Sequence, residues 1–191
     1  MKNQKPLNGI LSPLLQKIRI KKALPYITGK HILDVGSSEG EILRYLPHDV
    51  DYIGIEGNTA CCKIAQKIYP QHNFINLYLN VYNCDNLNIS ERDTILMLGI
   101  LEHLAQPVEI LKKLKKYLSG EGNIIITTPS NYTKWILKTG ARFRMFSSDK
   151  HEHKNHFSEY ELKRICENAG TSIIHYSRFE FRLNHLIVLR Q

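Results

Sequence analysis

The sequence of 191 residues contains no long apolar run and only four cysteines. No segment approaches the roughly 20 consecutive apolar residues of a membrane span, and the N-terminus lacks the apolar run and small-residue cleavage site of a signal peptide. We therefore expect a cytoplasmic protein without a transmembrane segment. The cysteines have neither zinc-knuckle spacing nor the density of a secreted disulfide scaffold, so we expect free thiols at Cys61, Cys62, Cys84 and Cys166.

Acidic residues are absent from the first thirty positions, although the same stretch contains seven basic residues. These are Lys2, Lys5, Lys17, Arg19, Lys21, Lys22 and Lys30. The net charge of the chain is +8, so residues 31–191 contribute only +1. A basic arm on a nearly neutral domain is typical of proteins that bind an anion, such as a phosphorylated small molecule, a nucleic acid or an acidic membrane surface. A solvated helix face has the same composition, and both interpretations stay open.

The rest of the chain alternates apolar strands with amphipathic helices. We expect helices after Ser12, near Glu39, after Asn58, from Pro107 and after Ser158, and strands at 31–35, 52–56, 74–81, 93–98, 123–128, 172–179 and 185–189. This order indicates an α/β layered sandwich with a largely parallel sheet. We expect a basic arm and helix at residues 1–30 and a single domain at residues 31–191, in which residues 131–156 form an insertion on the acceptor side.

Three of these helices have further sequence signals. The helix after Asn58 should bury an apolar face of Cys61, Ile64, Ala65 and Ile68. Gly120 and Gly122 should close the helix that begins at Pro107. Ser158 and Glu161 have the spacing of a capping box at the start of the last helix.

The stretch from His31 to Gly40 reads HILDVGSSEG, and Glu56 follows 22 residues after Asp34. An apolar strand that runs into a Gly/Ser turn and then a helix lets backbone amides approach a nucleotide-like ligand closely. The alternative is a plain strand–turn–helix crossover. Ligands of parallel sheets bind beyond the carboxyl ends of the strands, so the loops after the first four strands should converge on one site.

From His31 onward the chain resembles the class I S-adenosylmethionine-dependent methyltransferases, with a domain similar to methyltransferase types 11 and 23. Residues 32–40 resemble the first motif of that family, Asp-x-Gly-x-Gly-x-Gly, with Ser38 at the middle glycine. Glu56 resembles the ribose-binding acid. Residues 95–104 resemble the fourth-strand motif, 124–130 the strand that ends in Thr-Pro, and 153–162 the segment before the late helix. The resemblance implies a Rossmann-like three-layer sandwich with a mostly parallel seven-stranded sheet whose last strand is antiparallel.

The resemblance also implies S-adenosylmethionine as cofactor and a set of residues that contact it. Glu56 would accept hydrogen bonds from the two ribose hydroxyls, and Asp34 would lie near the ammonium group. Asn80 and Val81 would contact the adenine, with Asp85 as second choice. The complete predicted set is Asp34, Gly36, Ser37, Ser38, Gly40, Glu56, Asn80, Val81, Leu98 and Gly99, of which the last two would lie near the sulfonium.

Methyl transfer needs a general base only where the acceptor keeps its proton, and His103 is the candidate because histidine titrates near neutral pH. The alternative is that His103 only packs or hydrogen-bonds at the start of a short helix. His151, His153 and His156 form a second histidine cluster, for which solvated loop side chains are the expected interpretation and a metal site the alternative.

Glu102-His103 together with Glu152-His153-Lys154 resembles the metal-dependent small-RNA 3′-terminal 2′-O-methyltransferases, although Gly99 stands where that family has its first glutamate. Our prediction is a methyltransferase that acts on oxygen or nitrogen of a small or medium-sized acceptor, for which an anionic or phosphorylated molecule would suit the basic arm. The alternatives are a metal-assisted RNA 2′-O-methyltransferase and a methyltransferase-like binding module without turnover. Nucleic acid is the less favoured partner.

Overall fold

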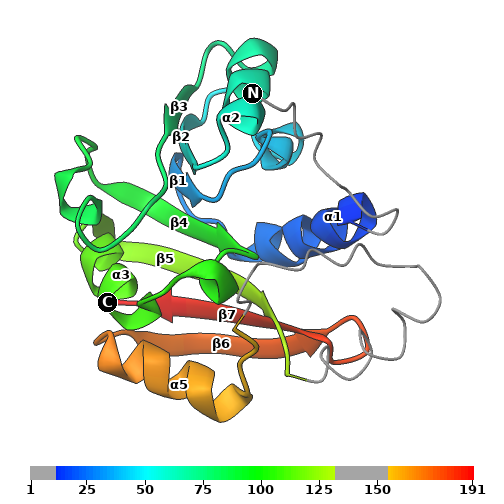
Figure 1. Ribbon diagram of the computed structural model, residues 1–191, viewed down its shortest axis with the longest axis vertical. Helices are drawn as coiled ribbons and strands as arrows, with labels where there is room; N and C mark the ends of the chain where they lie inside the picture. Colours follow the sequence, from blue (N-terminus) through cyan, green and yellow to red (C-terminus); the bar gives the residue numbers. More distant parts are fainter. Residues whose placement is uncertain (1–11, 132–154) are drawn as a thin grey trace, which may run out of the picture.

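The computed structural model describes residues 12–131 and 155–191, and a seven-stranded sheet forms its centre (Figure 1). The strand order is β3-β2-β1-β4-β5-β7-β6. Neighbours from β3 to β5 are parallel, whereas β7 runs antiparallel to both β5 and β6. The strands are β1 (His31–Val35), β2 (Asp51–Glu56), β3 (Asn73–Asn76), β4 (Arg92–Leu98), β5 (Leu118–Pro129), β6 (Ser172–Phe179) and β7 (Asn184–Arg190). The predicted fold class is therefore confirmed.

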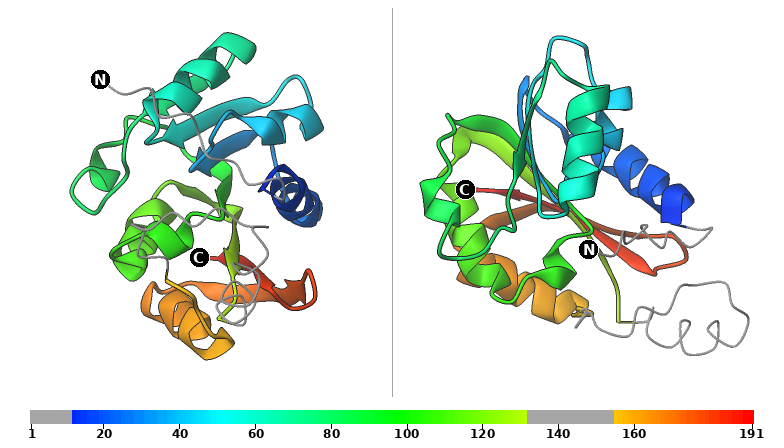
Figure 2. Two further views of the ribbon diagram at one scale, coloured as in Figure 1. Left: turned by 45° about the vertical axis from the view of Figure 1, so that its right-hand side comes forward. Right: turned by 45° about the horizontal axis from the view of Figure 1, so that its top comes forward.

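Helices cover both faces of this sheet, which gives three layers (Figure 2). Side chains of α1 (Ser12–Ala23) and α2 (Thr59–Ile68) pack in one apolar cluster, and those of α3 (Pro107–Lys115) and α5 (Glu159–Asn168) pack in the other. Successive strand residues point to opposite faces, so Ile32 belongs to the first cluster and Leu33 to the second. Central strands that are buried on both faces need the continuous apolar runs that the sequence contains.

Helix α1 is part of the folded domain. Ile20 and Ala23 are buried in the cluster shared with α2, whereas Lys17, Lys21 and Lys22 are exposed. The lysines therefore line the solvent side of a helix whose other side packs on the sheet. Lys2 and Lys5 of the predicted arm, and residues 132–154 of the predicted insertion, lie outside the described residues.

Three predicted elements differ from the observed ones. The helix expected near Glu39 is only a 3₁₀ turn, Glu41–Tyr45. The third strand ends at Asn76 and does not reach Val81. Asn80 Oδ1 accepts hydrogen bonds from the backbone N–H groups of Tyr82 and Asn83, which holds residues 80–83 in a turn where a strand was expected. The fifth strand begins at Leu118 and includes both Gly120 and Gly122, so the predicted helix end at these glycines is wrong.

The buried face of α2 also differs from the prediction. Cys62 and Ala65 are buried, whereas Ile64 and Ile68 are 39% and 48% exposed and Cys61 is half-buried. The N-cap fixes where the helix starts, since Asn58 Oδ1 accepts hydrogen bonds from the N–H groups of Ala60 and Cys61. The small residues then face the sheet.

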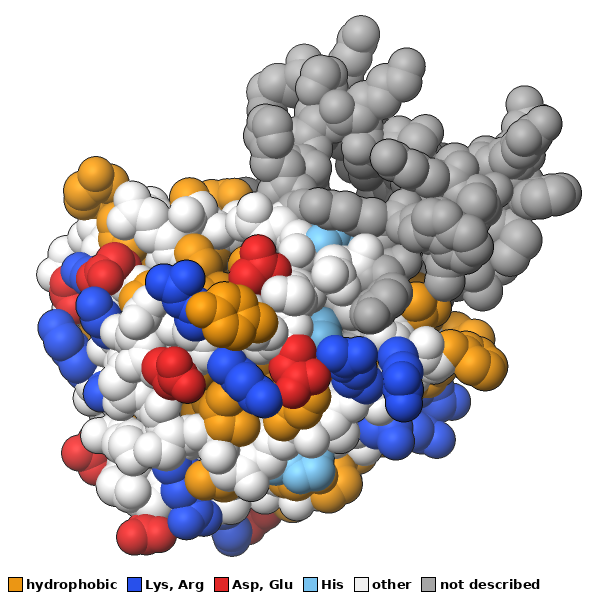
Figure 3. All heavy atoms as spheres, turned by 90° about the horizontal axis from the view of Figure 1, so that it is seen from below, with side chains coloured by type: hydrophobic (Ala, Val, Ile, Leu, Met, Phe, Trp, Pro, Cys, Tyr) orange, Lys and Arg blue, Asp and Glu red, His pale blue; other side chains and the backbone are white. Residues whose placement is uncertain are grey.

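The late helix α5 confirms the predicted capping box. Ser158 Oγ accepts a hydrogen bond from the Glu161 N–H, and the Glu161 carboxylate accepts one from the Ser158 N–H at 2.7 Å. Seen from below, this side of the molecule carries basic and acidic side chains interspersed (Figure 3). Glu159 of α5 forms ion pairs with Lys163 and with Arg178. Within the described part of the chain, no helix is both long and apolar enough to cross a membrane, and the four cysteines are free thiols.

Candidate active site

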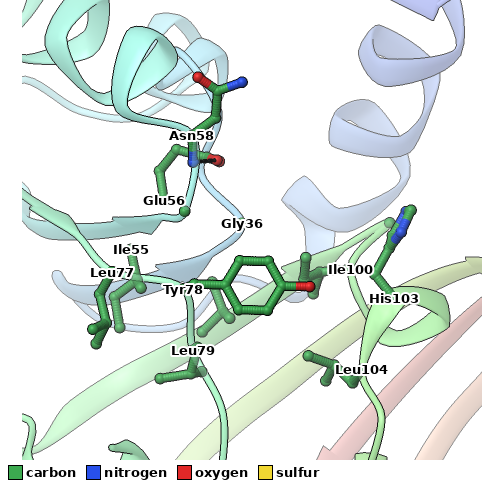
Figure 4. A pocket seen from close by; sticks show the side chains of 13 residues that line it. Gly36, Ile55, Glu56, Asn58, Leu77, Tyr78, Leu79, Ile100, His103 and Leu104 are labelled. Atoms are coloured by element: carbon green, nitrogen blue, oxygen red, sulfur yellow. Dashed lines mark hydrogen bonds between the residues drawn. The ribbon is translucent and has the colours of Figure 1, made fainter. Parts of the chain in front are cut away.

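A cavity of about 410 Å³ opens at the carboxyl ends of β1, β2 and β4 (Figure 4). It lies where the strand order reverses between β1 and β4, which is the usual ligand position of an open parallel sheet. Four connecting segments contribute to its lining: Val35–Gly36, Ile55–Asn58, Leu77–Leu79, and Gly99–Ile100 with His103–Leu104. The loops after the first four strands thus converge, and they enclose a volume typical of small-molecule sites.

The turn after β1 brings backbone to the edge of this cavity. Gly36 and Gly40 have φ values of +77° and +76°, in the left-handed region that favours glycine. The N–H groups of Gly36 and Ser37 donate to the Ile55 carbonyl at 2.8 and 3.1 Å, which ties the turn to the end of β2. A side chain at Gly36 would also lie 3.1 Å from Ile100. Glycine is therefore required there both for the turn and for the open cavity.

Ser38 occupies a left-handed conformation as well, with φ of +51°. This explains in backbone terms why a glycine is usual at this position of the motif. A serine can adopt this conformation, at a cost of roughly 1–2 kcal/mol relative to the right-handed one. The Ser38 N–H is used, since it donates to Glu56 Oε2 at 2.8 Å.

Glu56 ends β2 and lines the cavity (Figure 4). One carboxylate oxygen accepts from the Ser38 N–H and the other from the Asn58 N–H at 2.6 Å. These two bonds fix the side chain between the turn after β1 and the start of α2. A carboxylate offers about four acceptor positions, so each Glu56 oxygen can accept one further hydrogen bond from a ligand.

Asp34 lies below the turn and is only 5% exposed. The Tyr52 hydroxyl donates to its Oδ2 at 2.7 Å. Burial raises the pKa of the Asp34 carboxyl from 3.8 to about 7; the Tyr52 hydrogen bond lowers it in part, and the nearby Glu41 and Glu56 raise it further. The predicted residues Asp34, Gly36, Ser37, Ser38, Gly40 and Glu56 thus form one contiguous group around the turn, of which Gly36 and Glu56 line the cavity directly.

The residues predicted to contact adenine follow directly after the segment that lines the cavity. Asn80 is exposed and its amide is used within its own turn, and neither Asn80 nor Val81 lines the cavity. Asp85 forms ion pairs with Lys113 and Lys116. The wall at this place is made instead by Leu77, Tyr78 and Leu79.

The opposite wall follows β4. Leu98 ends that strand and packs toward the cluster beneath α1, while Gly99 and His103 line the cavity. Gly99 has φ of +80°, and a Cβ there would lie 2.6 Å from Arg19 Nη1. Arg19 Nη2 donates to Asn184 Oδ1 at 3.1 Å, so α1 is anchored beside this end of the site.

Metal ligands do not gather in the described part of the chain, where no group of three or more His, Cys, Asp or Glu side chains could hold an ion. Glu102 is 3% exposed, and its Oε2 accepts a hydrogen bond from Thr128 Oγ1 at 3.0 Å. His151, Glu152, His153 and Lys154 lie outside the described residues, so the predictions for them are not tested.

Sequence reasoning missed the aromatic and aliphatic residues of the cavity, above all Tyr78, Leu79 and Ile100. Leu79 and Ile100 follow strands closely, and position relative to the strand end is the signal that could have identified them. Tyr78 had no comparable signal, because the third strand was expected to continue to Val81.

Comparisons with known proteins agree with this geometry. A family model described as a methyltransferase domain matches residues 11–176. The ubiquinone biosynthesis O-methyltransferase of Coxiella burnetii (strain RSA 493 / Nine Mile phase I) is 26% identical over 181 residues, which cover 87% of this chain and 75% of that protein.

Two solved structures share the fold. The plantazolicin methyltransferase, solved with S-adenosylhomocysteine and a desmethyl analogue of plantazolicin, has a TM-score of 0.68 at 14% identity and covers 93% of this chain and 83% of its own. The magnesium protoporphyrin IX methyltransferase of Synechocystis PCC 6803, also with S-adenosylhomocysteine, has a TM-score of 0.67 at 12% identity, covering 98% and 90%.

Proposed function

Because the chain belongs to the methyltransferase domain family and is an S-adenosylmethionine-dependent methyltransferase, we propose that it methylates an oxygen atom of a small or medium-sized acceptor. The observation that carries the proposal is the cavity at the carboxyl edge of the sheet, with Glu56 and the left-handed turn on one side and His103 on the other. The O-methyltransferase name of the Coxiella relative favours oxygen over nitrogen.

The residues of the cavity fit the cofactor. Glu56 has two fixed carboxylate oxygens with remaining acceptor positions, which suits the two hydroxyls of a ribose. The turn from Gly36 to Gly40 has no bulky side chain at Gly36, where the backbone borders the cavity. When bound, the cofactor supplies a methyl group on a sulfonium. Asp34, Ser37, Ser38 and Leu98 stay predicted contacts of its methionine and sulfonium part.

The chain itself would bind, orient and deprotonate the acceptor. Ile100 and Leu104 form an apolar wall of the cavity, which would contact the acceptor. His103 lines the same wall, and its imidazole would accept the proton of the acceptor hydroxyl. Holding the acceptor oxygen in line with the transferred group supplies much of the rate of such a displacement.

The basic residues favour an acceptor that carries negative charge. Lys17, Lys21 and Lys22 are exposed on α1, whose Arg19 reaches the Gly99 end of the cavity. The short wall formed by Ile100, His103 and Leu104 suits a ligand of small or medium size. The metal-assisted RNA alternative gains no support from the described residues, because Glu102 is buried against Thr128. A cytoplasmic location stays a prediction.

Methyl transfer to matched acceptors tests the proposal. The protein and S-adenosylmethionine would be incubated with a phenol and an aniline of the same carbon skeleton, each with and without a carboxylate, and with a short RNA. Mass spectrometry would then detect the added methyl group. We expect the carboxylated phenol to be methylated fastest. Transfer to the aniline alone would contradict O-methylation, and transfer to RNA alone would contradict a small acceptor.

A further inference from the structure

Tyr78 is the aromatic side chain among the described residues that line the cavity. It lines the cavity, and yet it is 74% exposed. Figure 4 shows its ring lying across the cavity from the β3 side, with the hydroxyl directed toward the wall of Ile100 and His103. One side of the ring therefore faces the cavity, and the rest of the side chain faces water.

The backbone around Tyr78 is held at several points. The Leu77 N–H donates to the Glu56 carbonyl at 3.0 Å, which joins this segment to the end of β2. Asn83 Nδ2 donates to the Tyr78 carbonyl at 3.0 Å, and the Asn83 side-chain oxygen accepts from the Asn80 N–H at 2.9 Å. By contrast, within residues 12–131 and 155–191 the Tyr78 hydroxyl makes no hydrogen bond. Hydrogen bonds therefore hold the backbone of this segment, whereas among the described residues no hydrogen bond holds the ring.

Gly57 provides the space for the ring. A Cβ on Gly57 would lie 2.9 Å from Tyr78 Cδ2 and 3.4 Å from Tyr78 Cα. Gly57 does not have a positive φ, so its own backbone does not require glycine. Its role is to let the Tyr78 ring lie directly against the chain that follows Glu56.

Aliphatic residues from other elements also line the cavity. Val35 and Ile55 line it at the ends of β1 and β2, and Ile100 lines it after β4. A flat ring and these aliphatic side chains together border a slot that suits a planar, aromatic group. The slot begins next to Glu56 and Asn58, where the ribose is expected, and a nucleoside base is attached directly to its ribose.

We propose that Tyr78 is an aromatic gate for the cofactor: its ring swings aside to admit the nucleoside and then stacks on the base. This inference rests on the proposed function, because it takes S-adenosylmethionine as the ligand of the cavity. It assigns base recognition to Tyr78 and its Gly57 backing, in place of the amide of Asn80. The hydroxyl has no part in stacking, so the phenyl ring alone is sufficient.

The test is titration calorimetry and stopped-flow binding of S-adenosylhomocysteine and of adenosine, which need no acceptor. Base–aromatic stacking contributes about 1–3 kcal/mol per base, so Tyr78→Ala should weaken the binding of both ligands by roughly 5- to 150-fold. It should also raise the dissociation rate without slowing association, because no ring has to move. Tyr78→Phe should bind like the parent protein, and Gly57→Ala should weaken binding because its Cβ displaces the ring.

Tyr82→Ala is the matched control, since Tyr82 lies on the same segment, is 85% exposed and does not line the cavity. Thermal unfolding of Tyr78→Ala should match that of Tyr82→Ala, which separates lost stacking from lost stability. If Tyr78→Ala binds both ligands within twofold of the parent protein, the gate is refuted and the proposed function stands. If the parent protein binds neither ligand, the cofactor premise and the gate both fail.

Discussion

Asp34→Asn should make the stability of this protein less dependent on pH. The Asp34 carboxyl is almost completely buried, and Oδ2 accepts a hydrogen bond from the Tyr52 hydroxyl. Asparagine has the same shape and keeps an oxygen that can accept that bond, but it cannot ionise. The substitution therefore removes the charge of a buried group and leaves its packing in place.

The magnitude follows from the two pKa values of Asp34. The folded-state pKa is about 7 and the unfolded value is 3.8. Because the folded pKa is the higher one, the stabilising effect of the protonated carboxyl is complete below the unfolded pKa and is lost as the pH rises through the folded pKa. With about 1.4 kcal/mol per pKa unit, the parent protein loses roughly 2–3 kcal/mol between pH 5 and pH 8 that the Asn variant does not lose.

Urea unfolding of both proteins without cofactor, at pH 5 and at pH 8, measures this difference. Asp85→Asn is the control, because hydrogen bonds from Lys113 and Lys116 hold the pKa of Asp85 below its usual value. Asp85 and both lysines are therefore charged at both pH values, and the substitution should cost the same at each. An Asp34→Asn effect that does not change with pH would show that Asp34 ionises normally and would refute the burial argument.

Three further variants test separate parts of the account. Ser38→Gly should raise the unfolding temperature by about 2 °C, because removing the strain of the left-handed conformation outweighs the added freedom of glycine in the unfolded chain. A lower unfolding temperature would show that Ser38 is not strained. His103→Gln should lower kcat by roughly 100-fold and leave the affinity for S-adenosylhomocysteine unchanged, and an unchanged kcat would exclude His103 as the base. Ser158→Ala should lower the free energy of unfolding, measured in urea, by about 1 kcal/mol because the capping box is lost. A change below roughly 0.3 kcal/mol, which is about the measurement error, would show that the cap adds no stability.

The sequence predicts the central part of this fold because the signals there are local. Each parallel strand is a continuous apolar run, and Asn58 and Ser158 mark helix starts by hydrogen bonds that their own side chains make. The same holds for the turn at Gly36 and for Glu56, since the length of one strand and one turn sets their spacing. These residues were predicted together and lie together.

The incorrect predictions occur where contacts between residues distant in sequence determine the local structure. Gly120 and Gly122 look like a helix end, but the register between β4 and β5 shifts between Arg92 and Thr94. A Cβ on Gly122 would lie 2.9 Å from the Asp93 carbonyl oxygen, so glycine is needed there for the close approach of two strands. No local pattern reveals this partner.

Tyr78 and Asn80 show the same limit within the candidate site. The sequence predicts a strand up to Val81, whereas β3 ends at Asn76 and side-chain hydrogen bonds of Asn80 and Asn83 form a turn at residues 80–83. Leu77 to Leu79, between the strand and this turn, line the cavity. Hydrogen bonds between side chains and backbone help to determine which residues of a loop face a ligand. The composition of the loop does not reveal these bonds.

Calorimetric titration of S-adenosylhomocysteine into the parent protein, Glu56→Ala and Glu121→Ala tests the central claim most directly. Glu121 is an acid whose side chain is 95% exposed and which does not line the cavity, so its variant controls for lost charge. We predict one molecule bound per chain for the parent protein and for Glu121→Ala. Glu56→Ala should bind about 100-fold more weakly or worse, because two charge-assisted hydrogen bonds are lost. Equal binding by Glu56→Ala, or no binding by the parent protein, would contradict the account.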